Sequence, residues 1–287
     1  MVNWNGAPFL DALLDSVQAC APAELVIIDN RSTDDSGAIL QRHPSVTTVF
    51  NPANVGFGSA ANQGIRMTRA PFVLVANVDI APAPGSIDVL EQYMAEHPDV
   101  AVAAPRLVFP DGKLQLSLRS FPTPLRLFLY LSYLDRIFPS GYRLGAAEHQ
   151  ELKEVDQPMG AALLFRRDAL EKTGGFDPQF FLYMEEVDLC ERLKRAGWNI
   201  VYVPQAQVVH HAGGSSNQDW ERTQRNYIES VIRYFRKRSS FAGMVRLRFA
   251  LTLALILRSA IFLARGHMRQ AWFYLRSATQ IPYLRGY

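Results

Sequence analysis

Two polar side chains follow an apolar stretch that predicts a buried strand. Residues 72–76 form an unbroken apolar run, Asn77 and Asp79 come next, and a proline-rich turn follows at 82–85. In open α/β sheets, ligands bind at the carboxyl ends of the strands. A carboxylate there can bind a divalent cation, and the cation can bind the phosphates of a nucleotide. The alternative is that Asp79 only caps the next turn.

Three acidic side chains open the segment that is richest in candidate chemistry. Glu185, Glu186 and Asp188 follow an apolar, aromatic run and begin a helix that is predicted to close at Gly197. Acidic residues in a first turn are stabilised by the helix dipole, which explains part of the cluster without any function. A carboxylate held beside apolar groups can have a raised pKa, and such a group suits a general base.

A pair of histidines closes an apolar run further along the chain. His210 and His211 come directly after Val208 and Val209. An imidazole at a strand end can supply a metal ligand if other ligands lie nearby. The alternative is a structural role in the core.

A glycine pattern between residues 51 and 64 has two interpretations. Gly56, Gly58 and Ala61 nearly match the dinucleotide fingerprint, and Asp79 follows about 20 residues later. Against an NAD site, Pro52 separates the preceding strand from the glycines, and two β-α units come before it. The fingerprint normally follows the first strand of its fold.

The elements that must position these residues alternate between strand and helix. Residues 24–30 and 46–50 predict strands, residues 9–20 predict a helix, and a second helix is predicted to end near Arg42. This alternation predicts an α/β fold with a mostly parallel sheet and helices on both faces. The apolar residues before Asn3 are too few for a complete first strand, which predicts that this strand is truncated.

The composition is that of a globular protein with an unusual C-terminal part. The 287 residues are 48% hydrophobic and include two cysteines, which are too few for a disulfide framework or a zinc site. The start of the chain lacks the pattern of a secretory signal, so a cytoplasmic location is expected. Residues 221–287 hold 13 of the 30 Lys and Arg but two of the 27 Asp and Glu.

The C-terminal part predicts a domain of its own at residues 221–287, after a domain at 1–220. Residues 221–240 predict a basic helix, and the apolar run 249–257 is shorter than the roughly 20 residues that span a bilayer. We expect a helix that lies in the interface of an anionic membrane, peripheral on its inner face. The apolar, arginine-containing stretch 116–144 fits either a core helix or a helix at that membrane. Without base-reading motifs, nucleic acid is not expected as a partner.

These segments together resemble glycosyltransferase family 2, and within it the rhamnosyltransferase-like branch. The resemblance covers about residues 1–225 in the order of the family. The segments that carry it are 3–5 with 28–34, 54–64, 77–79, and 185–190 with 209–210. The second of these accounts for the glycine pattern without any NAD.

The resemblance implies a GT-A fold and assigns the site residues. Asp79 and His210 would hold Mg²⁺ or Mn²⁺. Glu186 would be the catalytic base, with Glu185 and Asp188 orienting it or binding acceptor hydroxyls, although the choice between the two glutamates stays open. The residues assigned to the nucleotide sugar are Asn3, Trp4, Asn5, Asp29, Asn30, Asp34, Gly56, Asn62 and Asn77.

The activity implied by the resemblance is an inverting, metal-dependent sugar transfer. The donor would be a dTDP- or UDP-sugar, with L-rhamnose from dTDP-rhamnose favoured. The acceptor would be a hydroxyl of a glycan or lipid-linked glycan in cell-surface polysaccharide synthesis. Two positions depart from the family, since Asn77 replaces the first acid of its metal motif and Glu186 replaces an aspartate base. The alternatives are an inactive scaffold, an NAD-dependent oxidoreductase and a nucleotidyltransferase.

Overall fold

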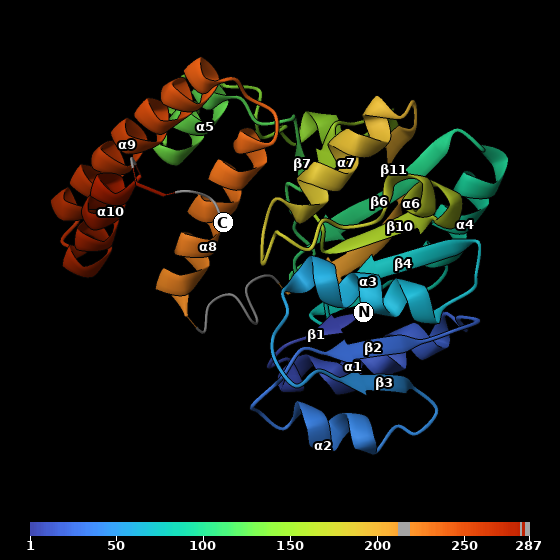
Figure 1. Ribbon diagram of the computed structural model, residues 1–287. Coiled ribbons are helices and arrows are strands. Elements are labelled where there is room, and N and C mark those ends of the chain that lie inside the picture. Colours follow the sequence, from blue (N-terminus) through green and yellow to red (C-terminus); the bar gives the residue numbers. More distant parts are fainter. Residues whose placement is uncertain (212–218, 282, 285–287) are drawn as a thin grey trace. The chain divides into compact units, whose positions relative to one another are not determined.

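The computed structural model describes residues 1–211, 219–281 and 283–284 and divides into two compact units (Figure 1). Unit 1 comprises Met1–Arg119 and Leu144–Gln218, and unit 2 comprises Ser120–Arg143 and Asp219–Tyr287. The sequence predicted two continuous domains with a boundary at residue 220. The structure differs because the segment from Ser120 to Arg143 belongs to unit 2, where its helix α5 packs on α9.

Unit 1 begins with a parallel sheet, as the alternation of strand and helix patterns predicted. The elements are β1 (Val2–Asn3), α1 (Ala7–Ala19), β2 (Val26–Asp29), α2 (Ser36–Gln41) and β3 (Thr47–Phe50). The strands lie in the order β1-β2-β3, and both pairs are parallel. All four residues of β2 are buried, so the strand ends by placing the carboxylate of Asp29 at the carboxyl edge of the sheet.

The larger sheet of unit 1 is mixed, and its strand at residues 72–76 pairs with an antiparallel neighbour. Its elements are β4 (Phe72–Ala76), β5 (Ile80–Pro82), β6 (Val100–Val108), β8 (Lys153–Glu154), β10 (Ala162–Arg166) and β11 (Asn199–His210). The order is β4-β10-β6-β11-β5, and β8 pairs with β11. β4 is antiparallel to β10, while a parallel bridge between Val2 and Asn77 joins its end to β1. Asn77 therefore lies at the edge where β1 also ends.

Helices and two apolar clusters hold these sheets in place. The helices are α3 (Phe57–Met67), α4 (Ser86–Glu96), α6 (Arg167–Thr173) and α7 (Glu185–Arg195). α1 contributes Leu10, Leu13 and Leu14 to one buried cluster, and α4 contributes Leu90 and Met94 to the other. Figure 1 shows α3 in front of the strands, where it contacts β1 and β2. A short strand pair, β7 (Leu118–Arg119) with β9 (Gln157–Pro158), and the 3₁₀ helix η2 (Ala147–His149) complete this unit.

Unit 2 is helical. Its elements are α5 (Pro124–Leu131), the 3₁₀ helix η1 (Leu134–Arg136), α8 (Trp220–Arg236), α9 (Phe241–Ala264) and α10 (Met268–Gln280). α9 packs against α5, α8 and α10, and it buries Leu247, Leu251 and Leu255. The predicted basic helix at 221–240 corresponds to α8.

Helix α9 is longer than the sequence predicted. The apolar run 249–257 belongs to a helix of 24 residues whose most apolar window has a mean hydropathy of 1.9 and is 28% buried. Within the described ranges it is the one helix whose length and composition would allow it to cross a membrane. The expectation that the apolar segment is too short to span a bilayer is therefore wrong as far as length is concerned, because the helix continues through Arg258. The interfacial placement itself stays a prediction.

Candidate active site

The acid pair lies at the first turn of α7, directly after a strained stretch of backbone. Tyr183 and Met184 both have a φ of 67°, in the left-handed region that residues other than glycine rarely adopt. The backbone N–H of Asp188 donates to Met184 O at 2.8 Å, which closes the first helical turn behind them. Such strain persists where the surrounding structure determines the conformation, and here it sets the direction of Glu185 and Glu186.

The surroundings of the two glutamates disfavour their charged forms. Glu185 is 5% exposed and Glu186 is half-buried, and Oε2 of each is shielded from solvent with no hydrogen-bond partner among the described residues. Burial raises the pKa of Glu185 well above its ordinary value, and the charge of Glu186 raises it further. Burial also raises the pKa of Glu186, against smaller lowering effects of backbone hydrogen bonding and the Arg119 guanidinium. A raised pKa makes each carboxylate a stronger base near neutral pH.

Two glycines show which way each glutamate lies. A Cβ added to Gly58 of α3 would lie 3.5 Å from Glu185 Cβ and 3.0 Å from Phe176 Cβ, so Glu185 packs against α3. A Cβ added to Gly160, which follows β9, would lie 3.4 Å from Glu186 Cβ. Because Glu186 is the more exposed of the pair, the geometry supports Glu186 rather than Glu185 as the group that reaches an acceptor.

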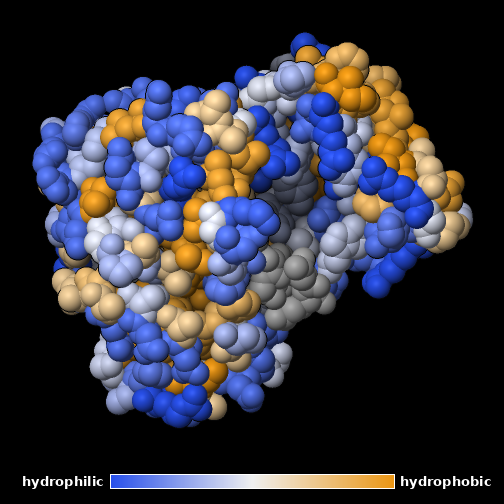
Figure 2. Space-filling model, turned by 180° about the vertical axis from the view of Figure 1, so that it is seen from behind, coloured by the Kyte–Doolittle hydropathy of each residue, from blue (hydrophilic) through white to orange (hydrophobic). Residues whose placement is uncertain are grey.

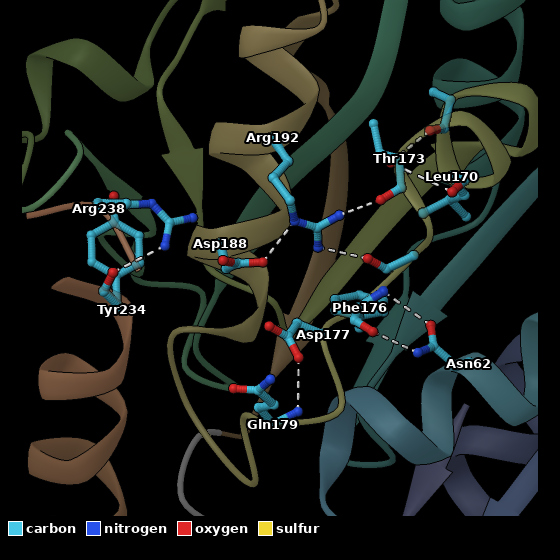
Figure 3. A network of polar contacts seen from close by, with 12 residues as sticks. Asn62, Leu170, Thr173, Phe176, Asp177, Gln179, Asp188, Arg192, Tyr234 and Arg238 are labelled. Carbon is cyan, nitrogen blue, oxygen red and sulfur yellow. Dashed lines mark hydrogen bonds and ion pairs between the residues drawn. The ribbon is translucent and has the colours of Figure 1, made fainter. Parts of the chain in front are cut away.

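Asp188 forms an ion pair with an arginine of its own helix. Its side chain is fully buried, and its Oδ2 accepts from Arg192 Nε at 2.7 Å (Figure 3). The same guanidinium donates to Thr173 O and Gly175 O, both at 2.6 Å. The Asp188–Arg192 pair thus ties α7 to the loop after α6, and it acts on the site by positioning α7.

A second set of hydrogen bonds joins that loop to α3 through Asn62. Asn62 Nδ2 donates to Phe176 O at 2.7 Å, and its Oδ1 accepts from Phe176 N at 3.0 Å (Figure 3). Both amide atoms are therefore used by one backbone unit. These bonds position the chain that leads to the acid pair, and the contact of Asn62 with the nucleotide sugar stays a prediction.

Gly56 is required by a close approach of two backbones. It has a φ of 86°, and an added Cβ would lie 2.5 Å from Phe181 O. Phe57 N donates to the same oxygen at 2.9 Å. Because protein backbone already fills the space that the glycine opens, a pyrophosphate would not fit there. This overturns both the dinucleotide interpretation and the predicted contact of Gly56 with the donor.

The candidate metal ligands meet through the pairing of β5 with β11. These strands are antiparallel with Ile80 opposite His210, and His211 N donates to Asp79 O at 2.9 Å. As a result, Asp79 Oδ1 lies 3.5 Å from His210 Nε2. His211 itself packs against Phe9, with ring centroids 5.1 Å apart. Only one of the two histidines thus faces the carboxylate.

Gln115 is a buried partner of this pair that sequence reasoning missed. Its Oε1 accepts from His210 Nδ1 at 2.7 Å, so the electron pair of Nε2 is left toward Asp79. Nothing in the sequence distinguishes this glutamine from other polar residues near a turn. It is 6% exposed, as is His210.

The donor atoms suit a divalent cation that also binds phosphate. Mg²⁺ is usually bound by one or two carboxylates together with substrate phosphates, and Mn²⁺ likewise prefers carboxylate and other oxygen ligands. Asp79 and His210 supply such a pair, and Asn77 lies two residues before Asp79 with a half-buried side chain. Over the described ranges, no group of three His, Cys, Asp or Glu gathers as a metal site. The pair would therefore depend on ligand oxygens to complete the coordination.

A polar network occupies the ends of β1 and β2, where the nucleotide was predicted. Asn3 Nδ2 donates to Asp29 Oδ2 at 2.7 Å and to Ser32 Oγ at 3.0 Å, and Asp29 Oδ1 accepts from Ser32 N at 3.0 Å. Asn5 Oδ1 accepts from Thr33 N at 2.7 Å. These bonds hold the two strand ends together. Beside them lies Trp4, which is half-buried.

Asp34 and Asn30 position loops rather than present free groups. Exposed Asp34 accepts from Ala7 N at 3.0 Å and from Ser36 N at 3.1 Å, at the starts of α1 and α2. Asn30 is 2% exposed, and its amide bonds Asn54 Oδ1, Gly56 O, Asn51 Nδ2 and Val55 N. These side-chain bonds of Asn30 go to the segment 51–56, while its backbone N–H donates to Asn3 O at 2.7 Å. Asn30 thus positions that segment, and its contact with the nucleotide stays a prediction.

The family models and the similar proteins agree on the kind of protein that this chain resembles. Glycosyl transferase family 2 matches residues 1–174, and Glycosyl transferase family group 2 matches residues 148–283. The chain is 32% identical over 288 residues to the N-acetylglucosaminyl-diphospho-decaprenol L-rhamnosyltransferase of Mycobacterium tuberculosis, a match that covers 94% of this chain and 93% of that protein. It is 24% identical over 251 residues to a low-salt glycan biosynthesis hexosyltransferase of Haloferax volcanii, covering 85% and 76%.

Solved structures with the same fold include a mannosyltransferase and the protein TarS. The mannosyltransferase PcManGT from Pyrobaculum calidifontis, in complex with GDP-Man and Mn²⁺, has a TM-score of 0.58 at 18% identity and covers 99% of this chain and 83% of its own. Staphylococcus aureus TarS 1–349 has a TM-score of 0.53 at 12% identity and covers 97% and 90%. At these identities the likeness shows the fold, which is GT-A as the sequence predicted.

Proposed function

The chain belongs to glycosyl transferase family 2 and is a glycosyltransferase, and from this premise we propose that it transfers L-rhamnose from dTDP-rhamnose to a lipid-linked glycan. The 32% identity to a rhamnosyltransferase, over nearly the full length of both proteins, supports L-rhamnose as the sugar and a lipid-linked acceptor. One structural observation carries the proposal that the chain is active, namely the buried pair Glu185 and Glu186 at the strained start of α7.

The reaction would be a single displacement that inverts the anomeric centre. Glu186 would take the proton of the acceptor hydroxyl while that oxygen forms its bond to the anomeric carbon. The bond from the same carbon to the diphosphate oxygen would break on the opposite face, and the nucleoside diphosphate would leave with the electron pair. Glu185 would support this step by its position beside Glu186, where burial raises the pKa of Glu185 and the charge of Glu186 raises it further.

Asp79 and His210 would hold a divalent cation, Mg²⁺ or Mn²⁺, against the diphosphate. When bound, the cation would neutralise charge that develops on the leaving group. Asn77 would contribute through water, and Gln115 would keep the Nε2 atom of His210 directed at the site. The network of Asn3, Asn5 and Asp29 with Trp4 would face the base and ribose of a dTDP- or UDP-sugar.

Membrane association is a further part of the proposal. Of the 18 large hydrophobic side chains that are exposed in the described ranges, 13 belong to unit 2. That unit also carries 16 Lys and Arg against four Asp and Glu. Apolar surface combined with basic charge favours an anionic membrane. We place the enzyme in the cytoplasm, peripheral on the inner face of the cell membrane, where a lipid-linked acceptor would be accessible.

The substitution Glu186→Gln tests the function. It removes the base while it keeps the shape of the side chain, so transfer from dTDP-rhamnose to a lipid-linked N-acetylglucosamine acceptor should be lost. Thermal stabilisation by dTDP with Mn²⁺ should remain, since ligand that binds the folded state raises the melting temperature. Exposed Glu171 on α6 provides the control variant, Glu171→Gln. Unchanged turnover in Glu186→Gln would remove Glu186 as the base, and absent turnover in the wild type would favour the scaffold.

A further inference from the structure

Unit 2 contains a basic pocket of its own. Its volume is about 100 Å³, well above the space that a single water needs, so it can admit a phosphate group. The pocket is lined by Tyr130, Tyr133, Asp135, Arg136, Arg143 and Arg258, which come from α5, η1, the segment after η1, and α9. Three guanidinium groups and one carboxylate face this volume, which gives the pocket a net positive charge.

The arginine from α9 is held in place by the pocket itself. Arg258 donates to Leu131 O at 3.3 Å and to Tyr133 Oη at 2.7 Å, and its guanidinium lies 4.4 Å from the centroid of the Tyr133 ring and 4.8 Å from that of Tyr274. Its Nε is buried and has no hydrogen-bond partner among the described residues. A buried donor without a partner is unfavourable, so a ligand that supplies an acceptor would remove that cost.

The other two arginines are available for a ligand. Within the described ranges neither Arg136 nor Arg143 forms an ion pair, and both are exposed at the mouth of the pocket. The guanidinium of Arg136 lies 5.1 Å from the centroid of the Tyr133 ring. Tyr133, whose ring also faces Arg258, has a φ of 60° and is held in a strained conformation. The strained backbone and the two cation–π contacts, with Arg136 and Arg258, hold the Tyr133 ring in place, and this ring orders the pocket.

The chemistry of the lining selects a phosphate ester. Guanidinium forks match phosphate oxygens in pairs, and the excess of two positive charges suits a doubly charged anion. The single carboxylate, Asp135, repels anions, so the binding of weakly charged anions is disfavoured. The net positive charge of the pocket still attracts a diphosphate. The pocket thus fits a diphosphate better than a carboxylate ligand.

Exposed apolar side chains adjoin the same elements. Ile137 and Phe138, which follow Arg136, are 70% and 61% exposed, and Leu125 of α5 is 65% exposed. Hydrophobic surface extends over unit 2, as the orange atoms along the right-hand edge of Figure 2 show. A diphosphate that carries an apolar chain could place its charge in the pocket and its chain on this surface.

We infer that the pocket binds the isoprenoid diphosphate of the lipid-linked acceptor, an inference that rests on the proposed function. Arg136, Arg143 and Arg258 bind the diphosphate oxygens, and Leu125, Ile137 and Phe138 contact the isoprenoid chain. The pocket therefore selects acceptors by their lipid diphosphate, independently of the sugar that receives the transfer.

The test measures binding of farnesyl diphosphate to the full chain, with farnesol and inorganic diphosphate as partial ligands. The double variant Arg136→Gln/Arg143→Gln removes two exposed charges, while Arg258 is left unchanged because it also holds Leu131 and Tyr133. We expect its affinity for farnesyl diphosphate to fall about tenfold or more, since hydrogen bonds to charged groups are among the strongest. The control Arg265→Gln/Arg276→Gln removes the same charge from exposed positions of unit 2 and should change the affinity less than about twofold.

The outcomes separate this inference from the proposed function. Equal losses in the two double variants, equal binding by wild type and pocket variant, or full displacement of farnesyl diphosphate by phosphatidylglycerol vesicles would each overturn the inference. Wild-type binding of farnesyl diphosphate without any sugar transfer would overturn the proposed function and leave the pocket as a lipid diphosphate site. Retained stabilisation of the pocket variant by dTDP with Mn²⁺ shows that the donor site is intact.

Discussion

Replacing Gln115 by leucine tests whether the metal site is built as the hydrogen bonds indicate. Gln115 Oε1 accepts from His210 Nδ1 at 2.7 Å, and both side chains are 6% exposed, so water cannot easily replace the lost acceptor. The variant leaves a buried N–H without a partner, which costs about 1–3 kcal/mol. It also frees the ring to rotate its Nε2 away from Asp79 Oδ1, which now lies 3.5 Å from it.

The expected effect is on metal affinity more than on nucleotide affinity. Loss of a partner that orients a metal-binding histidine typically weakens metal binding by about 10–100-fold, which corresponds to about 1.4–2.8 kcal/mol. The assay is a titration of Mn²⁺ at saturating dTDP, followed by the melting temperature and by sugar transfer. Gln115→Leu should require correspondingly more Mn²⁺ in both readouts, and saturating Mn²⁺ should restore most of the transfer rate.

Two control variants make this prediction refutable. Gln115→Glu keeps an acceptor for Nδ1–H and should retain Mn²⁺ affinity close to that of the wild type. Gln92→Leu changes an exposed glutamine on α4 and should have no effect on the titration. If Gln115→Leu shows the wild-type Mn²⁺ dependence, or if its loss of transfer does not respond to Mn²⁺, then His210 is not a ligand that Gln115 orients.

Three further substitutions follow from the buried groups of unit 1. Because the folded-state pKa of Glu185 is raised, its contribution to stability is full below its unfolded pKa and is lost as the pH rises through the folded value. Glu185→Gln, which cannot ionise, should therefore melt higher than the wild type at pH 8 but equally near pH 4.5; equal melting at both would contradict the raised pKa. Arg192→Met removes the ion pair of the buried carboxylate of Asp188 and should lower the free energy of unfolding by about 3–5 kcal/mol, measured in urea, whereas Arg195→Met on the exposed face should change it little. Gly56→Ala should fail to fold or melt several degrees lower, because its Cβ would lie 2.5 Å from Phe181 O; a wild-type melting temperature would show that this backbone approach is not required.

The strand-end residues illustrate what was predictable from the sequence. Asp79 and His210 each follow a short apolar run, and such runs place the next polar residue at the edge of a sheet where ligands bind. The sequence could not reveal that β5 and β11 are antiparallel neighbours, because pairing depends on the whole sheet. It was this pairing that brought the two residues within 3.5 Å. The prediction that they share a metal ion stays untested.

Residues that hold loops could not be separated from residues that hold ligands. Asn30, Asn62 and Asp188 have the same side-chain chemistry as ligand-binding residues, and their partners, which include backbone atoms as well as side chains, are set by the fold rather than by a sequence signal. Gln115 shows the converse, since an ordinary glutamine gains its role from the ring beside it. The type of a buried polar side chain predicts that it will form hydrogen bonds. It does not predict which groups will be its partners.

Arg258 explains why the length of α9 was predicted incorrectly from the sequence. The same residue lines the pocket of unit 2. A charge within an apolar run reads as an interruption when the run is treated as lipid-facing. In the structure its guanidinium lies over the Tyr133 and Tyr274 rings and bonds Leu131 O, so the charge is accommodated by α5, η1 and α10 rather than by solvent. The helix therefore continues through it to Ala264. The feature that made the tail look too short for a membrane is the same group that gives unit 2 a buried donor for a phosphate.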